Sequence, residues 1–395
     1  MIKLRFSRSI LLLVLALGSA RAEAVSSPFG DGKNPWLGLE MTREELLPAI
    51  TRTAGYLVRQ QLADGQFVYL NDPRGKARQA SGDKYSLIRH LGAVYALLRA
   101  HEQAPNPAVL AAARRGLDFA KGFVVTKGGV SQLKGLNGKP NLGENGFLVL
   151  DLALYAKLQG PGFAADRTMT DALAGFVADH LVYGNELSTK EQWAECQAAM
   201  GLILYQEAFG APRGRATSYI TTAEQWLIAA RNDGKRSHWS IQAASWLGRA
   251  RPNVDKLLLE EGLIAGHAQM EGVFDQNSAG SSPRLVGSKA GKLNSCNATA
   301  RTEGLIAAHS LAKRLYRTDE AQYFWSRAKE HLAFGMQFQY GSPGNFYERD
   351  PLLSRLGRLF HLDGGVFDSP ANGSVRIDYV SHHLRAMTAF LSAQR

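Results

Sequence analysis

Two kinds of predicted helix alternate along the chain, six times in succession. The first kind is amphipathic, and the second is apolar or small-residue-rich on nearly all sides, with polar groups near its start. The amphipathic segments are 44–62, 107–123, 165–182, 217–231, 253–269 and 319–338, and the apolar ones are 85–101, 143–158, 191–209, 237–249, 298–315 and 376–393. A single pair cannot bury such an apolar second helix. Six pairs closed into a ring can, with the apolar helices inside, and the repeat of roughly 50 to 60 residues fits that arrangement.

The segment 294–313 illustrates the apolar kind. A polar approach from Asn294 to Asn297 leads directly into an apolar helix with an interior Gly304. The helix still carries Arg301 and Glu303 near its start, and such charges are rarely buried unless they are paired. Because residues two apart do not share a helix face, we expect one of them to point into the ring and the other toward a neighbour. Asn297 or Thr299 is a candidate N-cap of this helix.

The connections between helices also differ in length. Links from an amphipathic helix to the next apolar one are often long and glycine-rich, whereas the reverse links are short. The long loops therefore gather on the face where the apolar helices begin. Long loops on a compact scaffold commonly carry function, and the helix N-termini add positive dipole ends there. We expect the functional site on this face.

Glycine–aromatic turns occur at Gly65–Phe67, Gly272–Phe274 and Gly364–Phe367. They resemble the turns of six-hairpin glycosidase-type proteins, and the alternation over the whole mature chain resembles an all-α (α/α)6 toroid. The resemblance implies inner and outer rings of helices. It names no single family, because polysaccharide lyases, sugar epimerases and terpene cyclases share the barrel. The aspartate-rich motifs of terpene cyclases are absent from this chain.

The first residues have the pattern of an export signal. Lys3, Arg5 and Arg8 precede an apolar run at Ile10–Leu17, which is too short for a bilayer span of roughly 20 residues. Ala20–Ala22 fits the small-residue cleavage rule. We therefore predict a signal peptide at 1–22, a single toroid domain at 23–395, and a periplasmic or secreted protein. No later stretch suggests stable insertion into a membrane.

Charge and cysteine content set broad limits on partners. Loss of the signal peptide lowers the formal net charge from +11 to about +7. This excess suits an anionic partner, but the chain lacks the basic, aromatic-interleaved runs typical of nucleic-acid binding. The two cysteines, Cys196 and Cys296, could be bridged or free in an exported protein.

Carboxylates at the starts of the inner helices are candidate acids and bases. Glu144 opens the second inner helix, where the helix dipole favours its anion. Glu191 and Glu195 are four apart on the third, so that one of them could have a raised pKa and act as a general acid. This pair is too close for inverting glycoside hydrolysis, and Glu303 is an equally good acid from an opposing helix.

Asp378 and His382 lie four residues apart on the last inner helix and share a face. A carboxylate that orients a histidine is a common catalytic or ligand arrangement. The alternative is structural, with Asp378 holding His382 in the closure between the last and first hairpins.

The other polar or aromatic groups at the helix starts are candidate substrate-binding residues: Tyr85, Arg89, His90, His238, Trp239, Arg301 and Arg376. Trp239 could stack on a sugar ring or belong to the core. Arg89 could equally pair with an acid of a neighbouring inner helix and lock the ring. The histidines are scattered and lack a metal-binding spacing such as HExxH, so we predict neither a metal site nor another cofactor.

Three functions fit these patterns. The first is an exported carbohydrate-active enzyme, a glycoside hydrolase that acts on a polysaccharide with Glu195 or Glu303 as acid and Asp378 or Glu144 as base. The second is a uronate lyase or sugar epimerase in which Tyr85 or Tyr379 and His382 move a proton. The third is a non-catalytic protein that binds or assembles an exported polysaccharide. In each case the partner is a polysaccharide or oligosaccharide.

Overall fold

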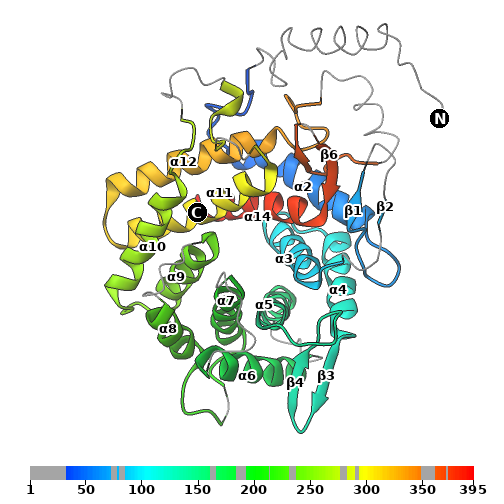
Figure 1. The fold of residues 1–395 in the computed structure, drawn as a ribbon, viewed down its shortest axis with the longest axis vertical. Helices are drawn as coiled ribbons and strands as arrows, with labels where there is room; N and C mark the ends of the chain where they lie inside the picture. Colours follow the sequence, from blue (N-terminus) through cyan, green and yellow to red (C-terminus); the bar gives the residue numbers. More distant parts are fainter. Residues whose placement is uncertain are drawn as a thin grey trace, which may run out of the picture.

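The computed structural model describes residues 33–72, 78–79, 85–160, 166–183, 193–212, 214–230, 237–275, 283–289, 293–347, 361–370 and 372–395. Two concentric rings of helices dominate this part of the chain (Figure 1). The inner ring contains α3 (Leu87–Gln103), α5 (Leu142–Gln159), α7 (Trp193–Phe209), α9 (His238–Ala250), α11 (Ser295–Arg314) and α14 (Ile377–Ala393). The outer ring contains α2 (Arg43–Arg59), α4 (Pro107–Lys121), α6 (Arg167–Tyr183), α8 (Tyr219–Ala230), α10 (Lys256–Gln269) and α12 (Thr318–Met336).

The inner ring closes because α14 packs against both α11 and α3. Burial follows the two sequence patterns. In α5 every residue from Leu142 to Ala156 except Glu144 is buried, whereas α4 buries only one face, which includes Val109, Ala112 and Gly116. The predicted (α/α)6 toroid is therefore confirmed.

The close approach of α5 and α7 depends on glycine. A Cβ on Gly201 of α7 would lie 2.4 Å from the backbone oxygen of Gly146 in α5, and a Cβ on Gly146 would lie 2.4 Å from Ala198 Cα. Neither obstacle is a flexible side chain that could move away. The two backbones can therefore cross at this distance only without side chains at these positions.

Gly201→Ala is expected to destabilise the protein by about 1–3 kcal/mol or more, because the added methyl group forces the two helices apart. Urea unfolding followed by circular dichroism measures this loss. Gly175→Ala in α6, where a Cβ would meet only ordinary contacts at 3.6 Å and beyond, controls for the general cost of replacing a helical glycine. A smaller loss for Gly201→Ala than for this control would contradict the close crossing.

A small sheet joins the loops of the first and last hairpins. Its strand order is β2-β1-β6-β5, formed by β1 (Leu70–Asn71), β2 (Arg78–Gln79), β5 (Phe367–Ser369) and β6 (Asn372–Arg376). Leu70 of β1 pairs with Arg376 of β6, and the Ile377 amide donates to the Tyr69 carbonyl oxygen over 3.2 Å. The sheet thus places the segment before β1 beside the first turn of α14.

A second hairpin, β3 (Val124–Lys127) with β4 (Val130–Leu133), projects from the outer ring after α4 (Figure 1). The sequence predicted almost no strands. Segments of two to five residues are too short to show the alternation of polar and apolar residues that identifies a strand.

Several inner helices begin with a side-chain cap. Asn294 caps α11 by accepting from the Asn297 amide over 2.9 Å, so the predicted caps Asn297 and Thr299 are wrong. Thr299 instead donates its hydroxyl to the Ser295 carbonyl within the helix. Asn141 and Ser237 cap α5 and α9 in the same way as Asn294.

The predicted signal peptide at 1–22 lies outside the described residues. Within the described ranges, no helix has both the length and the apolar character needed to cross a membrane.

Cys196 in α7 and Cys296 in α11 are both free thiols, which answers the question that the sequence left open.

Candidate active site

A cavity of about 460 Å³ opens among the N-terminal halves of the inner helices. Its described lining comes from five inner helices and one cap residue: Ile88, Arg89 and Gly92 of α3, Phe147 of α5, Trp193 and Gln197 of α7, Ser237 before α9, His238 and Trp239 of α9, and Asp378, Ser381, His382 and Arg385 of α14. The cavity lies on the predicted face. Its volume and its mixture of aromatic and polar groups are typical of a small-molecule site.

His382 is held from behind by two charged side chains. Its Nδ1 lies 2.8 Å from Oε1 of Glu303, which reaches over from α11, and 2.6 Å from Nη2 of Arg385, one turn further along α14. Arg385 also donates to Glu303 over 3.1 Å, and both of these side chains are only 3% exposed. Arg385 Nη2 lies 3.4 Å from His382 Nε2.

These contacts give neutral His382 a partner in either tautomer. When Nδ1 carries the proton, the Glu303 carboxylate accepts it, and when Nδ1 is bare, the Arg385 guanidinium donates to it. Burial and then the Arg385 charge hold the pKa of His382 well below its usual value. Burial raises the pKa of Glu303, although Arg385 opposes that rise. The imidazole is therefore neutral near pH 7 and can accept or donate a proton at its other nitrogen.

His238 lies beside His382, with 5.6 Å between the ring centroids in an edge-to-face arrangement. It packs against α11, since a Cβ on Gly304 would lie 3.0 Å from the His238 Cβ. Together with Gln269, whose Oε1 would lie 2.7 Å from the same Cβ, this contact explains the glycine in the middle of that helix. Burial lowers the pKa of His238 to about 3, and its Nε2 has no hydrogen-bond partner in the described part of the chain. Two neutral imidazoles thus line one wall.

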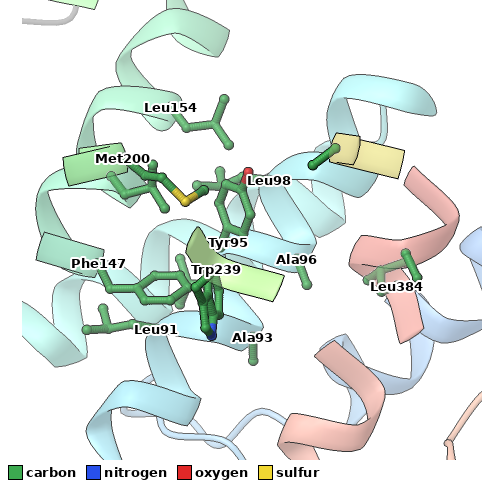
Figure 2. Packing of buried hydrophobic residues seen from close by; sticks show 14 of the residues in the cluster. Leu91, Ala93, Tyr95, Ala96, Leu98, Phe147, Leu154, Met200, Trp239 and Leu384 are labelled. Atoms are coloured by element: carbon green, nitrogen blue, oxygen red, sulfur yellow. The ribbon is translucent and has the colours of Figure 1, made fainter. Parts of the chain in front are cut away.

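Trp239 forms part of the cavity floor and of the core, which were the two alternatives for this residue. Its ring packs edge-to-face on Phe147 at 5.6 Å, and the Arg385 guanidinium lies 4.8 Å from the ring centroid. Figure 2 shows Trp239 and Phe147 side by side, with Tyr95 above them in this view. This apolar layer closes the cavity from below.

The four-residue spacing had predicted that Asp378 orients His382, but in the structure Asp378 has other partners. Arg376 binds both carboxylate oxygens, over 2.5 and 2.8 Å, and Arg89 of α3 makes a second ion pair over 3.2 Å. Arg89 also donates to the Tyr69 hydroxyl. Arg89 thus pairs with an acid of a neighbouring inner helix, which was one alternative for this residue, and it also lines the cavity, which was the other. The carboxylate that contacts His382 is Glu303.

Tyr85 and His90 do not line the cavity, so their prediction as substrate-binding residues is not supported. The Tyr85 hydroxyl lies 2.7 Å from His90 Nδ1, and His90 Nε2 lies 2.9 Å from the Gly116 carbonyl oxygen of α4. Both are packed with Phe67 and Phe119 in an aromatic cluster between the rings. Burial lowers the pKa of His90 to about 4 and raises that of Tyr85. Of the three substrate-binding candidates at the start of the first inner helix, only Arg89 lines the cavity.

Glu144, Glu195 and Arg301 also lie outside the cavity lining. Glu195 is buried in the first turn of α7, while its predicted partner Glu191 lies outside the described residues. Arg301 points toward α12, where its charge adds to burial in lowering the pKa of His331. The prediction that Arg301 and Glu303 point in different directions is confirmed, with Glu303 directed inward.

Sequence reasoning missed Arg385, Ser381 and Gln197 of the cavity wall. Arg385 lies three residues after His382 and seven after Asp378, so it continues the same stripe along α14. That spacing was a usable signal for its position. Its pairing with a glutamate of another helix was not visible in the sequence.

Burial of the Glu144 carboxyl group is expected to lower the folding stability of the protein above the unfolded pKa of that group. Burial raises its pKa to about 7, and its Oε2 has no hydrogen-bond partner among the described residues. A carboxyl with a raised folded-state pKa loses stability as the pH rises from its unfolded value through its folded value. Glu144→Gln should therefore stabilise the protein at pH 8 by up to about 3 kcal/mol and change little at pH 4.5. Urea unfolding at both pH values measures this, and an equal effect at both would contradict it.

In the described part of the chain, no three His, Cys, Asp or Glu side chains are grouped so that they could hold a metal ion. The polar groups that face the cavity are instead imidazoles, guanidiniums, an amide, hydroxyls and the paired Asp378 carboxylate. Such a set can bind a polyhydroxylated molecule and transfer protons.

Comparison with solved structures finds the same architecture at low sequence identity. A D-mannose isomerase matches 89% of this chain and 98% of its own at 12% identity with a TM-score of 0.58. The GH76A α-1,6-mannanase of Salegentibacter sp. HEL1_6 matches 88% and 99% at 10% identity with a TM-score of 0.56. The cellobiose 2-epimerase of Spirochaeta thermophila DSM 6192 matches 90% and 98% at 13% identity with a TM-score of 0.54.

No protein-family model matches the chain. No curated protein matches it either. The solved structures are (α/α)6 toroid enzymes, and at these identities they establish the fold that this chain shares with them.

Proposed function

We propose that the protein is a carbohydrate-active enzyme that moves a proton on a sugar carbon next to a carbonyl group, as a sugar epimerase or an aldose–ketose isomerase. The observation that carries the proposal is His382, a neutral cavity histidine whose Nδ1 has a carboxylate and a guanidinium as partners. Such an imidazole can take a proton at Nε2 and return it without a change in its surroundings.

The steps follow from the cavity wall. His382 Nε2 accepts the proton from the carbon next to the carbonyl, while Nδ1–H donates to Glu303 and steadies the imidazolium. Arg385 supplies positive charge for the oxygen that becomes negative. Isomerisation results when the hydroxyl proton of the first carbon moves to the former carbonyl oxygen and His382 returns its proton to the former carbonyl carbon. Epimerisation results when the intermediate turns in the cavity and His382 returns the proton to the opposite face of the original carbon, so that His382 ends neutral in both cases. Glu303 acts here as a positioning residue.

Glycoside hydrolysis, the first function considered from the sequence, receives less support. It requires two carboxyl groups that flank the scissile bond. Asp378 is the only carboxylate in the described cavity lining, and two guanidiniums hold it. An inactive variant of the Salegentibacter mannanase changes two consecutive aspartates, and this chain contains no two consecutive aspartates.

The neighbours that bear on the proposal are the mannose isomerase and the cellobiose epimerase, since the first is named as an isomerase and the second as an epimerase of a sugar. The cavity is suited to the reducing end of a mono- or oligosaccharide. The net positive charge of the chain is compatible with an acidic sugar as substrate. We further propose that the protein is exported after cleavage near Ala22.

Incubation of the mature protein with a panel of neutral and acidic reducing sugars tests the proposal. Carbon-13 NMR should detect a new epimer or ketose, with no increase in reducing ends and no ultraviolet absorbance. An increase in reducing ends would instead indicate hydrolysis, and absorbance of an unsaturated uronide would indicate a lyase. Binding without any product across the panel would favour a non-catalytic role.

The pH dependence of kcat/KM follows from the histidines. The base must be unprotonated, and burial lowers the pKa of both His382 and His238. Activity should therefore persist as the pH falls below about 6.5, the ordinary histidine pKa, and its acid limb should lie well below that value. An acid limb at or above pH 6.5 would contradict the assignment.

A further inference from the structure

A second cavity of about 390 Å³ lies among the C-terminal halves of the inner helices, and its described lining shares no residue with the first cavity. Three inner helices, α3, α9 and α14, contribute to both. Trp239 of α9 lines the first cavity and Trp246 the second, while on α14 Arg385 lines the first and Ser392 the second. The two cavities therefore open toward opposite ends of the ring.

One face of α11 forms a wall of the second cavity. Its members are Glu303, Ile306, Ala307, Ser310, Leu311 and Arg314, which follow the three- and four-residue spacing of one helix face. Arg314 lies eleven positions after Glu303, which corresponds to about 16 Å along the helix. The wall is thus polar at both ends and apolar in its middle.

A parallel stripe on α9 consists of Gln242, Ser245, Trp246 and Arg249. The walls from α9 and α11 therefore provide an aromatic ring, hydroxyl groups and an amide. Saccharides present apolar C–H faces and hydroxyl edges, and sites that bind them combine apolar surface with a few convergent polar groups. This composition fits a saccharide of one or two rings.

The charges at the open end favour an acidic ligand. Arg99 is paired with Glu102 over 2.6 Å, and Arg249 with Glu207 over 2.9 Å. Arg314 donates to the carbonyl oxygens of Pro252 and Arg251, over 2.6 and 3.3 Å, and no carboxylate in the described ranges pairs with it. Its positive charge is therefore not neutralised, and a guanidinium has five N–H donors with which to bind an anion.

The inner end has the opposite character. Glu303 faces this cavity while its Oε1 accepts from Arg385 and contacts His382 on the other side. Other titratable groups near it are His238 and Tyr95, whose pKa values its charge affects. Arg385 balances the Glu303 charge, so the carboxylate can accept hydroxyl donors without repelling an anion about 16 Å away.

We propose that the second cavity binds a carboxylate-bearing saccharide. Its acidic group would pair with Arg314 at the mouth and its ring would pack on Trp246, whereas the hydroxyl groups of a second ring would reach Gln242 and Glu303. This site differs from the sugar site of the proposed function. It needs no turnover, and the failure of either proposal leaves the other standing.

Isothermal titration calorimetry of the mature protein tests the proposal, with D-glucuronate as probe and D-glucose as its neutral counterpart. Glucuronate should bind at least tenfold more tightly than glucose, because glucose cannot pair with Arg314. Inorganic phosphate should bind more weakly than glucuronate, because it lacks the ring and hydroxyl groups. Glucose or phosphate binding as tightly as glucuronate would overturn the ligand class.

Two variants locate the bound ligand. Arg314→Gln removes the charge, and Ala307→Phe fills the apolar middle, so each should weaken glucuronate binding at least tenfold. Arg317→Gln is the matched control, since Arg317 lies three residues further on, pairs with Glu260 and Glu320, and should leave binding unchanged. Circular dichroism verifies that each variant is folded. Glucuronate binding that survives both cavity substitutions would place the ligand elsewhere and overturn the proposal.

Discussion

His382→Asn is expected to lower kcat/KM by about 10²- to 10⁴-fold, the usual contribution of a general acid–base residue. The asparagine amide can still donate a hydrogen bond toward Glu303, but it cannot accept and return a proton. Binding should change little, so the loss should appear in kcat rather than in KM. Initial rates on the sugar identified by the panel measure both constants.

The adjacent histidine provides a matched control. His383 is fully buried and faces α12, since a Cβ on Gly335 would lie 3.6 Å from its Nδ1. His383→Asn should therefore affect stability and leave the chemical step intact. The role of His382 would be refuted if its asparagine variant kept more than a tenth of the activity of the wild-type enzyme.

Arg385→Met is expected to cause the largest loss of stability, about 3–5 kcal/mol, because it leaves the Glu303 carboxylate buried without its cation. Burial already raises the pKa of Glu303, and the loss of Arg385 removes the main opposing influence. A raised folded-state pKa costs stability as the pH rises through it. The destabilisation should thus be larger at pH 8 than at pH 5 when urea unfolding is compared at the two values.

The double variant Arg385→Met/Glu303→Gln separates stability from catalysis. It removes both charges and should recover much of the stability at pH 8, since replacing a whole buried pair costs less than breaking it. Activity should stay low, because His382 then lacks both partners that set its tautomer. An Arg385→Met variant that loses under 1 kcal/mol at both pH values would contradict a buried ion pair.

The ring was predictable because helix burial leaves a direct mark in the sequence. An inner helix such as α5 is buried almost all round and is therefore apolar all round, whereas α4 buries one face. The short strands were not predictable, since pairs such as Leu70 with Arg376 depend on contacts between distant loops.

The sequence predicted that the site lies where the inner helices begin, but it did not predict which side chains contact each other there. Arg89 and His90 are adjacent, so they point about 100° apart on a helix, and only one could face the cavity. Spacing alone favoured Asp378 as the partner of His382. In the structure Asp378 pairs with Arg376 and Arg89, and His382 contacts Glu303 of another helix. Local spacing could not predict the contact with Glu303, because it does not show which residues of different helices are neighbours.

Deuterium incorporation most directly tests the claim that His382 moves a proton on a sugar carbon. The wild-type enzyme and His382→Asn would be incubated in D₂O with the sugar that the panel identifies, and proton NMR would follow the carbon next to the carbonyl. We expect the wild-type enzyme to form product with deuterium at that carbon, and the variant to form neither product nor deuterated sugar. Product released by the wild-type enzyme through cleavage of a glycosidic bond, with that carbon unlabelled, would contradict proton transfer.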